Sequence, residues 1–151
     1  MFSRIHYGIE IYGGCSETLL KKIQTIQNKL LKVLFNLPRR TNTNELHSRL
    51  KILKVKDIYQ SQVLKFVFES LKKTNIVQFH NLFRYKHTIH THNTRQPMKL
   101  YSTIMRTKYG KSTLYYKGTQ LWNLLSTDVQ NCSTLYGFKR IVKQKFIDSY
   151  S

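Results

Sequence analysis

Residues 16–38 read SETLLKKIQTIQNKLLKVLFNLP, and this stretch indicates the fold class more clearly than any other part of the chain. Ser16 is a favourable N-cap, Glu17 suits the positive end of a helix dipole, and Pro38 stops a helix. Between them, apolar residues recur every three or four positions, which places them on one narrow helical stripe. The stripe consists of Leu19, Ile23, Ile26, Leu30, Val33 and Leu37, and we expect it to face the core.

Further helices are expected on both sides of the chain's midpoint. A short helix is predicted at about 45–50 and a longer one at about 56–72. The last helix is expected to begin near Ser133 or Thr134 and to run to about Tyr150. The residues expected to point inward are Tyr59, Val63, Phe66, Val67 and Leu71 in the long helix and Leu135, Phe138, Val142 and Phe146 in the last one.

Other segments are less regular. Residues 5–14 fit both a strand and one face of a helix, so their periodicity leaves the two open. Residues 74–97 lack a clear period and indicate a partly packed loop with about one helical turn. Two β-rich runs, 100–105 and 113–116, flank a turn at Gly110 and predict a small β-hairpin. A helix is expected at 119–124, with Trp122 as a core anchor rather than a base-stacking residue. The expected class is mainly α with a small β-hairpin (α+β), in a single module over residues 1–151.

The charge of the chain is its most unusual property. Lys and Arg number 26 against 7 Asp and Glu, so the net charge is +19 before histidine is counted. A hydrophobic content of 40% with eight Phe and ten Tyr is enough for a folded core. A compact domain with this charge repels itself and is stabilised by polyanions, of which RNA, DNA and anionic membrane are the obvious ones. A basic protein with no such partner is the alternative.

The candidate nucleic-acid contacts form two groups. The first group lies along one flank of the 17–37 helix and in the link behind it, and comprises Lys21, Lys22, Lys29, Lys32, Arg39 and Arg40. The second group comes from the cation-rich stretch 106–117 and comprises Arg106, Lys108, Tyr109 and Lys111. Cations neutralise phosphates and release counterions. The rings of Tyr109, Tyr115 and Tyr116 are suited either to stacking on unpaired bases or to ordinary packing, and both interpretations stay open.

Catalytic and metal chemistry finds little support in the sequence. The seven acidic residues are isolated from one another, whereas a two-metal centre needs clustered carboxylates. His87, His90 and His92 lie close together, yet no cysteine or acid nearby completes a zinc site, so a polar loop is preferred. Cys15 and Cys132 are far apart and indicate no disulfide framework. We therefore expect no catalytic centre, no metal and no cofactor.

The expected location is intracellular, in the nucleus or the cytoplasm. No run of apolar residues approaches the 18 or so that a membrane-spanning helix needs, so no membrane partner is expected. Residues 1–14 do not have the composition of a signal peptide, so secretion is not expected.

Several short motifs, in order, give the chain a resemblance to a known family. They are YGIEIYG at 7–13, KIQTIQNKLLKV at 22–33, TNELHSRLKILKVKDIY at 43–59, NTR at 93–95, YGKSTLYYKGTQLWN at 109–123 and STLYGFKRIVK at 133–143. Together they resemble the C-terminal region of reverse transcriptases from non-LTR (LINE-type, jockey-like) retrotransposons of animals. The most specific of them resembles the family's G-x-x-L/I-W-N-x-L-P, although Ser126 stands where the family usually has Pro.

The resemblance implies a helical, thumb-like part over 1–73, followed by a loop, hairpin and C-terminal helix over 74–151. Its expected role is to hold template RNA and primer DNA during reverse transcription, with the palm domain of the parent polymerase as a further partner. The palm's Y-x-D-D motif, an endonuclease domain and a Cys-rich knuckle are not found in this sequence, so polymerase activity is not carried over. The start at Met1 leads us to expect a truncated copy or a partial gene. A helical structural or protein-interaction remnant is the alternative.

Overall fold

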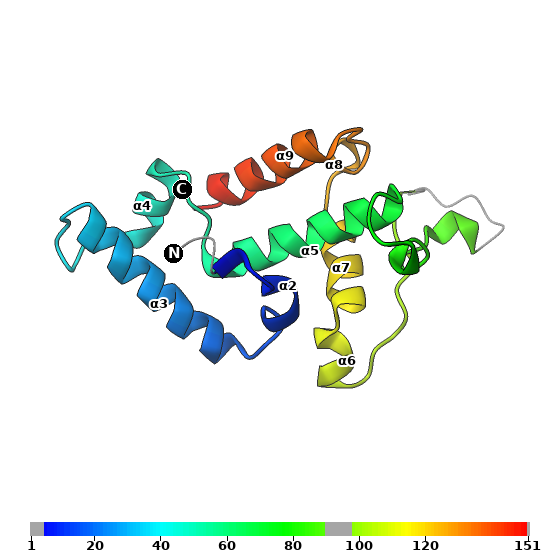
Figure 1. Ribbon diagram of the computed structural model, residues 1–151, viewed down its shortest axis with the longest axis horizontal. Helices are drawn as coiled ribbons and strands as arrows, with labels where there is room; N and C mark the ends of the chain where they lie inside the picture. Colours follow the sequence, from blue (N-terminus) through cyan, green and yellow to red (C-terminus); the bar gives the residue numbers. More distant parts are fainter. Residues whose placement is uncertain (1–4, 90–97, 151) are drawn as a thin grey trace.

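The computed structural model describes residues 5–89 and 98–150, and the regular secondary structure of this part is helical apart from one isolated β-bridge (Figure 1). The helices are α2 (Ile9–Tyr12), α3 (Glu17–Leu34), α4 (Thr43–Arg49), α5 (Val55–Leu71), α6 (Lys108–Ser112), α7 (Leu114–Asn123), α8 (Thr127–Gln130) and α9 (Leu135–Asp148). Two 3₁₀ turns, Val77–Phe79 and Lys86–Thr88, lie in the segment after α5. The prediction of a mainly α class is confirmed.

The four clearest sequence predictions correspond to α3, α4, α5 and α9, with ends that differ by a few residues. Residues 5–14, which periodicity left open, contain α2 rather than a strand. Capping residues explain two of the starts. The Asn42 side chain accepts a hydrogen bond from the backbone N–H of Asn44 before α4, and Thr134 accepts one from Gly137 at the start of α9.

Helix α5 is the axis of the molecule. In Figure 1 it crosses the centre, with α9 above it, α2 below it, α3 to its left, and α7 running downward from it. It packs against α2, α3, α7 and α9. Its buried side chains surround the helix and include Val55, Ile58, Tyr59, Val63, Leu64, Val67 and Phe68. A helix that is apolar all round is a buried one. Of the predicted inner residues, Tyr59, Val63 and Val67 are buried and Phe66 and Leu71 are partly buried, but the prediction of a single inner face missed Val55, Ile58, Leu64 and Phe68.

The core consists of two clusters along α5. The first surrounds its N-terminal half and brings in Ile9 from α2 and Ile147 from α9. In the second, the Phe68 ring stacks on Phe138 with centroids 4.6 Å apart, and Trp122 stacks on Phe138 at 5.9 Å. Trp122 is 2% exposed and its indole N–H donates to the carbonyl of Met98 over 3.2 Å. The prediction that Trp122 anchors the core is confirmed.

The predicted β-hairpin is wrong. Within the described residues the one β interaction here is an isolated antiparallel bridge between Tyr85 and Leu100, and residues 101–106 have no regular structure. The second run, 113–116, lies at the start of α7 instead. Two threonines decide this locally: the Thr107 hydroxyl accepts from the N–H of Gly110, and that of Thr113 accepts from the N–H of Tyr116. N-capping by threonine thus outweighs its strand preference.

Gly118 then lets α7 lie close to α5. A Cβ atom at this position would lie 2.8 Å from Cγ2 of Val67 and 3.1 Å from Cζ of Phe83. The helix predicted at 119–124 is the second half of α7, which begins at Leu114. The segment therefore adds a helical layer to α5 rather than a hairpin.

The predicted orientation of α3 holds for Ile23, which packs against the first core cluster, but not for half of the stripe. Three residues of the apolar stripe are well exposed: Leu19 is 50% exposed, Ile26 51% and Val33 77%. The buried residues of this helix are Gln27 and Leu31. The stripe was expected to face the core because its apolar residues recur at helical spacing.

Amide side chains lie with the apolar Leu20, Ile23 and Leu31 on the inward side of α3. Gln27 Nε2 donates to the carbonyl of Leu53 over 2.9 Å, and Gln24 Oε1 accepts from the backbone N–H of Val55 over 2.7 Å. Both backbone groups lie where the chain enters α5, and buried backbone groups without partners are costly. These two hydrogen bonds hold α3 against the start of α5.

His47 extends this polar network to α4. Its Nδ1 donates to the carbonyl of Ile52 over 2.9 Å, so the Nε2 of a neutral ring is an acceptor, and it accepts from Nε2 of Gln24 over 3.4 Å, beside Oδ1 of Asn28. His47 is completely buried, and this burial lowers its pKa. The neutral ring therefore links α3, α4 and the segment before α5.

Candidate nucleic-acid interface

A groove of about 1050 Å³ lies among the starts of α3 and α5, helices α6 and α7, and the end of α9. In Figure 1 the start of α3 and helix α6 both lie below α5, on either side of α2. The lysines that line the groove are Lys21, Lys54, Lys56, Lys108, Lys111 and Lys117, and the acidic residues are Glu17 and Asp57. The excess of cations makes the groove a suitable binding surface for consecutive phosphates.

Two glycines between α2 and α3 bring these elements together. A Cβ atom on Gly13 would lie 2.2 Å from Cδ2 of Tyr59, so the link passes directly over α5. A Cβ on Gly14 would lie 3.1 Å from the carbonyl oxygen of Ser112 at the end of α6. The link thus places the first turns of α3 and helix α6 around the same groove.

The acidic residues reduce the positive potential only in part. Glu17 and Lys56 are 4.0 Å apart, with side chains 80% and 65% exposed, so their pairing is weak. Asp57 accepts a hydrogen bond from the hydroxyl of Tyr150, and burial raises the pKa of this carboxyl group. Burial and the bond to Asp57 also raise the pKa of Tyr150.

Lys54 is part of the same arrangement. The Tyr150 hydroxyl accepts the backbone N–H of Lys54 over 3.0 Å, and Lys54 Nζ lies 4.2 Å from the centroid of the tyrosine ring. Its ammonium group also donates to Oδ1 of Asn44 over 2.9 Å. Lys54 is therefore held in place at the groove, while Lys21, Lys56, Lys108, Lys111 and Lys117 are exposed.

Three of the predicted contact residues come together in this groove. Lys21 belongs to the first predicted group, and Lys108 and Lys111 belong to the second. The two groups were predicted separately because they are far apart in sequence. In the folded chain, one lysine of the first group and two of the second line the same groove.

The other predicted cations lie elsewhere. Lys22 and Lys29 are exposed on the outer side of α3, and Arg106 is exposed before α6; none of the three lines the groove. Lys32 Nζ donates to the carbonyl of Arg39 over 2.7 Å, so it stabilises the turn after α3. At 1.5 Å per residue, the end of α3 is about 20 Å from Lys21. Arg39 and Arg40 are exposed beyond that end and are not part of the groove.

The tyrosines differ from one another. Tyr115 stacks on Phe83 with centroids 5.8 Å apart, and its hydroxyl donates to the carbonyl of Tyr101. Tyr115 therefore packs internally. Tyr109 is 87% exposed on α6, between Lys108 and Lys111 in sequence, which leaves its ring accessible to an unpaired base. Tyr116 is half-buried.

Lys54 and Lys56 were not among the predicted contacts. The signal was present in the sequence, since two lysines flank Val55 at the first turn of a predicted helix. That helix was interpreted as a core element only, because its apolar content dominates. Lys117 was recognised as one of the cations of the stretch 106–117 but was assigned to the hairpin region rather than to a helix.

Metal and membrane sites have no counterpart in the described part of the chain. Among residues 5–89 and 98–150, no three or more His, Cys, Asp or Glu side chains are grouped so as to hold a metal ion. His90, His92 and the NTR motif at 93–95 lie outside the described residues. None of the described helices has both the length and the apolar character that crossing a membrane requires.

Comparisons of the chain with protein-family models, with curated proteins and with solved structures gave no match.

Proposed function

We propose that this chain is a non-catalytic nucleic-acid-binding module that grips the phosphate backbone in the groove between α3, α5, α6 and α7. The observation that carries the proposal is the meeting of six lysines from separate segments around one groove of about 1050 Å³. Like charges brought this close repel one another, and a bound polyanion removes that repulsion. Tyr109, exposed on α6, adds a ring on which an unpaired base stacks.

We further propose that the chain is the C-terminal portion of a non-LTR retrotransposon reverse transcriptase. In that protein it holds template RNA and primer DNA. The positions of the motif residues support this. Gln24 and Gln27 of the QxxQNK segment hold α3 to α5, and Gly118 and Trp122 of the GxxLWN segment pack α7 into the core. Lys111 of the YGK segment lines the groove.

The test is binding of the full chain to a labelled RNA–DNA hybrid, to RNA and to single-stranded DNA, measured by fluorescence anisotropy over a range of salt. We expect a strong salt dependence, with a slope that reflects several phosphate contacts. Lys21→Gln/Lys108→Gln/Lys111→Gln should flatten this slope by roughly 2–3, because each duplex phosphate contact contributes about 0.9.

A matched control removes the same charge outside the groove. Lys22→Gln/Lys29→Gln/Lys145→Gln changes three exposed lysines that do not line it, and the slope should stay close to that of the unmodified chain. Equal effects of the two triple variants would mean that only net charge matters and would contradict a groove. Preference for the hybrid over both single strands would favour the reverse-transcriptase role.

A second candidate function is a protein-interaction role, and the outer face of α3 favours it. Leu19, Ile26, Val33, Leu34 and Phe35 are all substantially exposed on or just after this one helix. Exposed apolar patches on a helix mark sites of contact with other proteins. In this alternative, α3 packs against a neighbouring domain such as the polymerase palm. The groove is then not a nucleic-acid site, so the groove triple variant should bind nucleic acid as the unmodified chain does.

A further inference from the structure

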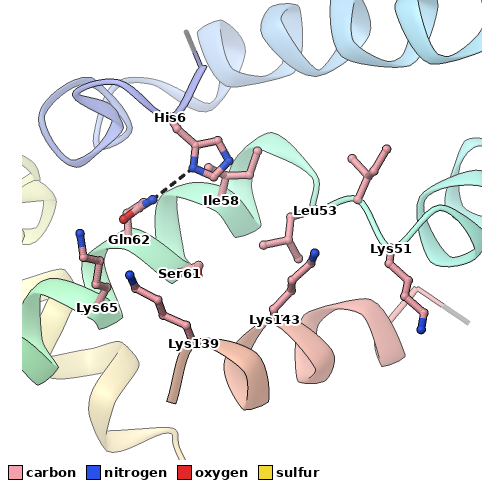
Figure 2. Close-up of a pocket in the computed structure, with 10 residues that line it drawn as sticks. His6, Lys51, Leu53, Ile58, Ser61, Gln62, Lys65, Lys139 and Lys143 are labelled. Carbon is pink, nitrogen blue, oxygen red and sulfur yellow. Dashed lines mark hydrogen bonds between the residues drawn. The ribbon is translucent and has the colours of Figure 1, made fainter. Parts of the chain in front are cut away.

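A second, smaller basic pocket lies between α5 and α9. Its volume is about 380 Å³, and its cations are Lys51, Lys65, Lys139 and Lys143, with His6 beside them. Figure 2 shows Lys139 and Lys143 rising from α9 toward α5, while Lys65 and Gln62 extend from α5. No acidic residue is among those that line the pocket.

This pocket is on the opposite side of α5 from the groove. Its α5 residues are Ile58, Ser61, Gln62 and Lys65, which at three and four residue spacings share one helical face. The groove is lined by Lys56 and Gln60 of the same helix. At 100° per residue, these two lie roughly half a turn away from the pocket face. The two depressions are therefore separate sites, and binding in the pocket does not depend on the proposed grip in the groove.

The positive charge of the pocket is poorly balanced. Lys65 Nζ is 3.8 Å from a carboxylate oxygen of Glu69, one turn further along α5. Within the described part of the chain, Lys51, Lys139 and Lys143 form no ion pair. Ammonium groups gathered without carboxylates favour an anion with several oxygens.

The pocket also offers neutral hydrogen-bonding groups. Gln62 Nε2 donates to His6 Nδ1 over 3.1 Å, so the proton of the neutral ring is on Nε2 and can be donated to a ligand. Desolvation lowers the pKa of His6, which favours this neutral form. The hydroxyl of Ser61 is a further donor at the lining.

The rest of the lining is apolar. Ile52 is half-buried and supplies apolar surface, while Leu53 and Ile58 at the same lining are almost completely buried core residues, and the aliphatic stems of the lysines add to the apolar surface. A free inorganic anion would gain nothing from this surface, whereas a ligand with an apolar body beside its anionic group would cover it. Pockets for small ligands are of about this size, from roughly 300 Å³ upward.

We propose that this pocket binds one nucleotide unit, with its phosphate among Lys65, Lys139 and Lys143 and its base against Ile52 and the apolar stems of the lining. The unit is either a free nucleotide or one nucleotide of a strand, since both present the same phosphate and base.

The test is isothermal titration calorimetry, in which the full chain is titrated separately with AMP, adenosine and inorganic phosphate. AMP should bind at least tenfold more tightly than either fragment, because it alone satisfies both the cations and the apolar surface. Lys139→Gln/Lys143→Gln should weaken AMP binding at least tenfold. Arg140→Gln/Lys145→Gln removes two exposed charges from α9 that do not line the pocket, and should change the affinity less than twofold.

Three results would overturn the proposal: phosphate binding as tightly as AMP, equal effects of the two α9 double variants, or no AMP binding by a chain whose circular dichroism shows it folded. The groove variant Lys21→Gln/Lys108→Gln/Lys111→Gln should keep its AMP affinity, and a loss there would assign AMP to the groove instead. Among outcomes that support the pocket, a trinucleotide that binds more tightly than AMP identifies a strand as the source. Equal affinities identify the free nucleotide.

Discussion

Helices α3 and α5 are nearly equal in length, at 18 and 17 residues, yet they differ in how many of their apolar side chains are buried. The sequence of α3 has a regular apolar stripe, and much of that stripe is exposed. The sequence of α5 has apolar residues on every side, and most of them are buried. A regular stripe therefore shows that a helix has an apolar face, but not that this chain covers it.

The contacts of the two helices differ in kind. Helix α5 is surrounded by α2, α3, α7 and α9 and is stabilised mainly by apolar packing. Helix α3 packs Leu20 and Ile23 against the first core cluster, and it is also attached through amides of Gln24, Gln27 and Asn28, which hydrogen-bond to one another and to the chain around α4 and the start of α5. Substitutions in and around the two helices test this difference, beginning with the largest expected effect.

Truncation of the α5 core should cost the most. Phe68→Ala removes a ring that is 2% exposed and stacked on Phe138, and it should lower the free energy of unfolding by about 3–5 kcal/mol. Urea denaturation measures this loss. Val33→Ala on α3, at a side chain 77% exposed, is the control and should change stability by less than about 0.5 kcal/mol. Similar losses for the two variants would remove the distinction between the helices.

Adding volume where α7 meets α5 should also destabilise the fold. Gly118→Ala places a Cβ 2.8 Å from Val67 Cγ2, and we expect a loss of about 1–3 kcal/mol in thermal or urea unfolding. Gln120→Ala, at an exposed position of the same helix, should have an effect within about 0.5 kcal/mol. A Gly118→Ala variant that is more stable than the parent would show that α7 does not pack this closely.

The attachment of α3 should depend on its amides. Gln27→Leu keeps much of the side-chain volume but leaves the carbonyl of Leu53 without its donor, so we expect a loss of about 1–3 kcal/mol by urea denaturation. Thr25→Ala, exposed on the same helix, serves as the control. If Gln27→Leu stabilised the protein, burial of apolar side chains rather than the hydrogen bond of Gln27 would hold α3 in place, as it holds α5.

The same attachment should weaken in acid. Burial lowers the pKa of His47 below its ordinary value of 6.5, so the unfolded chain takes up a proton more readily than the folded one. The stabilisation is complete above about pH 6.5 and is lost as the pH falls from there through the folded-state pKa. Burial raises the pKa of Asp57 above its ordinary value of 3.8. This group therefore lowers the stability of the fold as the pH rises from about 3.8 through its folded-state pKa.

The measurement is unfolding free energy against pH from about 5 to 8, the range in which histidine titrates, for the unmodified chain and for His47→Gln. His6 is present in both proteins, so the difference between the curves reports His47 together with its effect on the pKa of the nearby Asp57. A difference that does not change with pH would show that the ring of His47 is not held neutral.

Polar replacement on the outer face of α3 should have the smallest effect. Ile26→Gln and Val33→Gln each change a side chain that is at least half exposed, and the unfolding free energy should stay within about 0.5 kcal/mol of the parent. A loss of about 2 kcal/mol or more, as expected for core truncation, would place this face in contact with another surface.

Particular residues show where sequence reasoning succeeded and where it could not. The extents of α4, α5 and α9 were predicted from periodicity and capping, and Trp122 was recognised as a core residue. The hairpin failed because Thr107 and Thr113 act as N-caps, a role that depends on which backbone N–H each hydroxyl meets. Of the groove, Lys21, Lys108 and Lys111 were among the predicted contacts, whereas Lys54 and Lys56 were overlooked on a helix regarded as core.

The sequence by itself determined the mainly helical class, the approximate ends of the four clearest helices and the charge of +19. These properties follow from composition and from interactions between residues a few positions apart. The tertiary structure alone decided which face of α3 is buried, that residues 107–123 form α6 and α7, and that lysines of α3, α5, α6 and α7 line one groove. The physical reason is that burial and charge clustering depend on which distant segments meet around α5, and no local pattern contains that information.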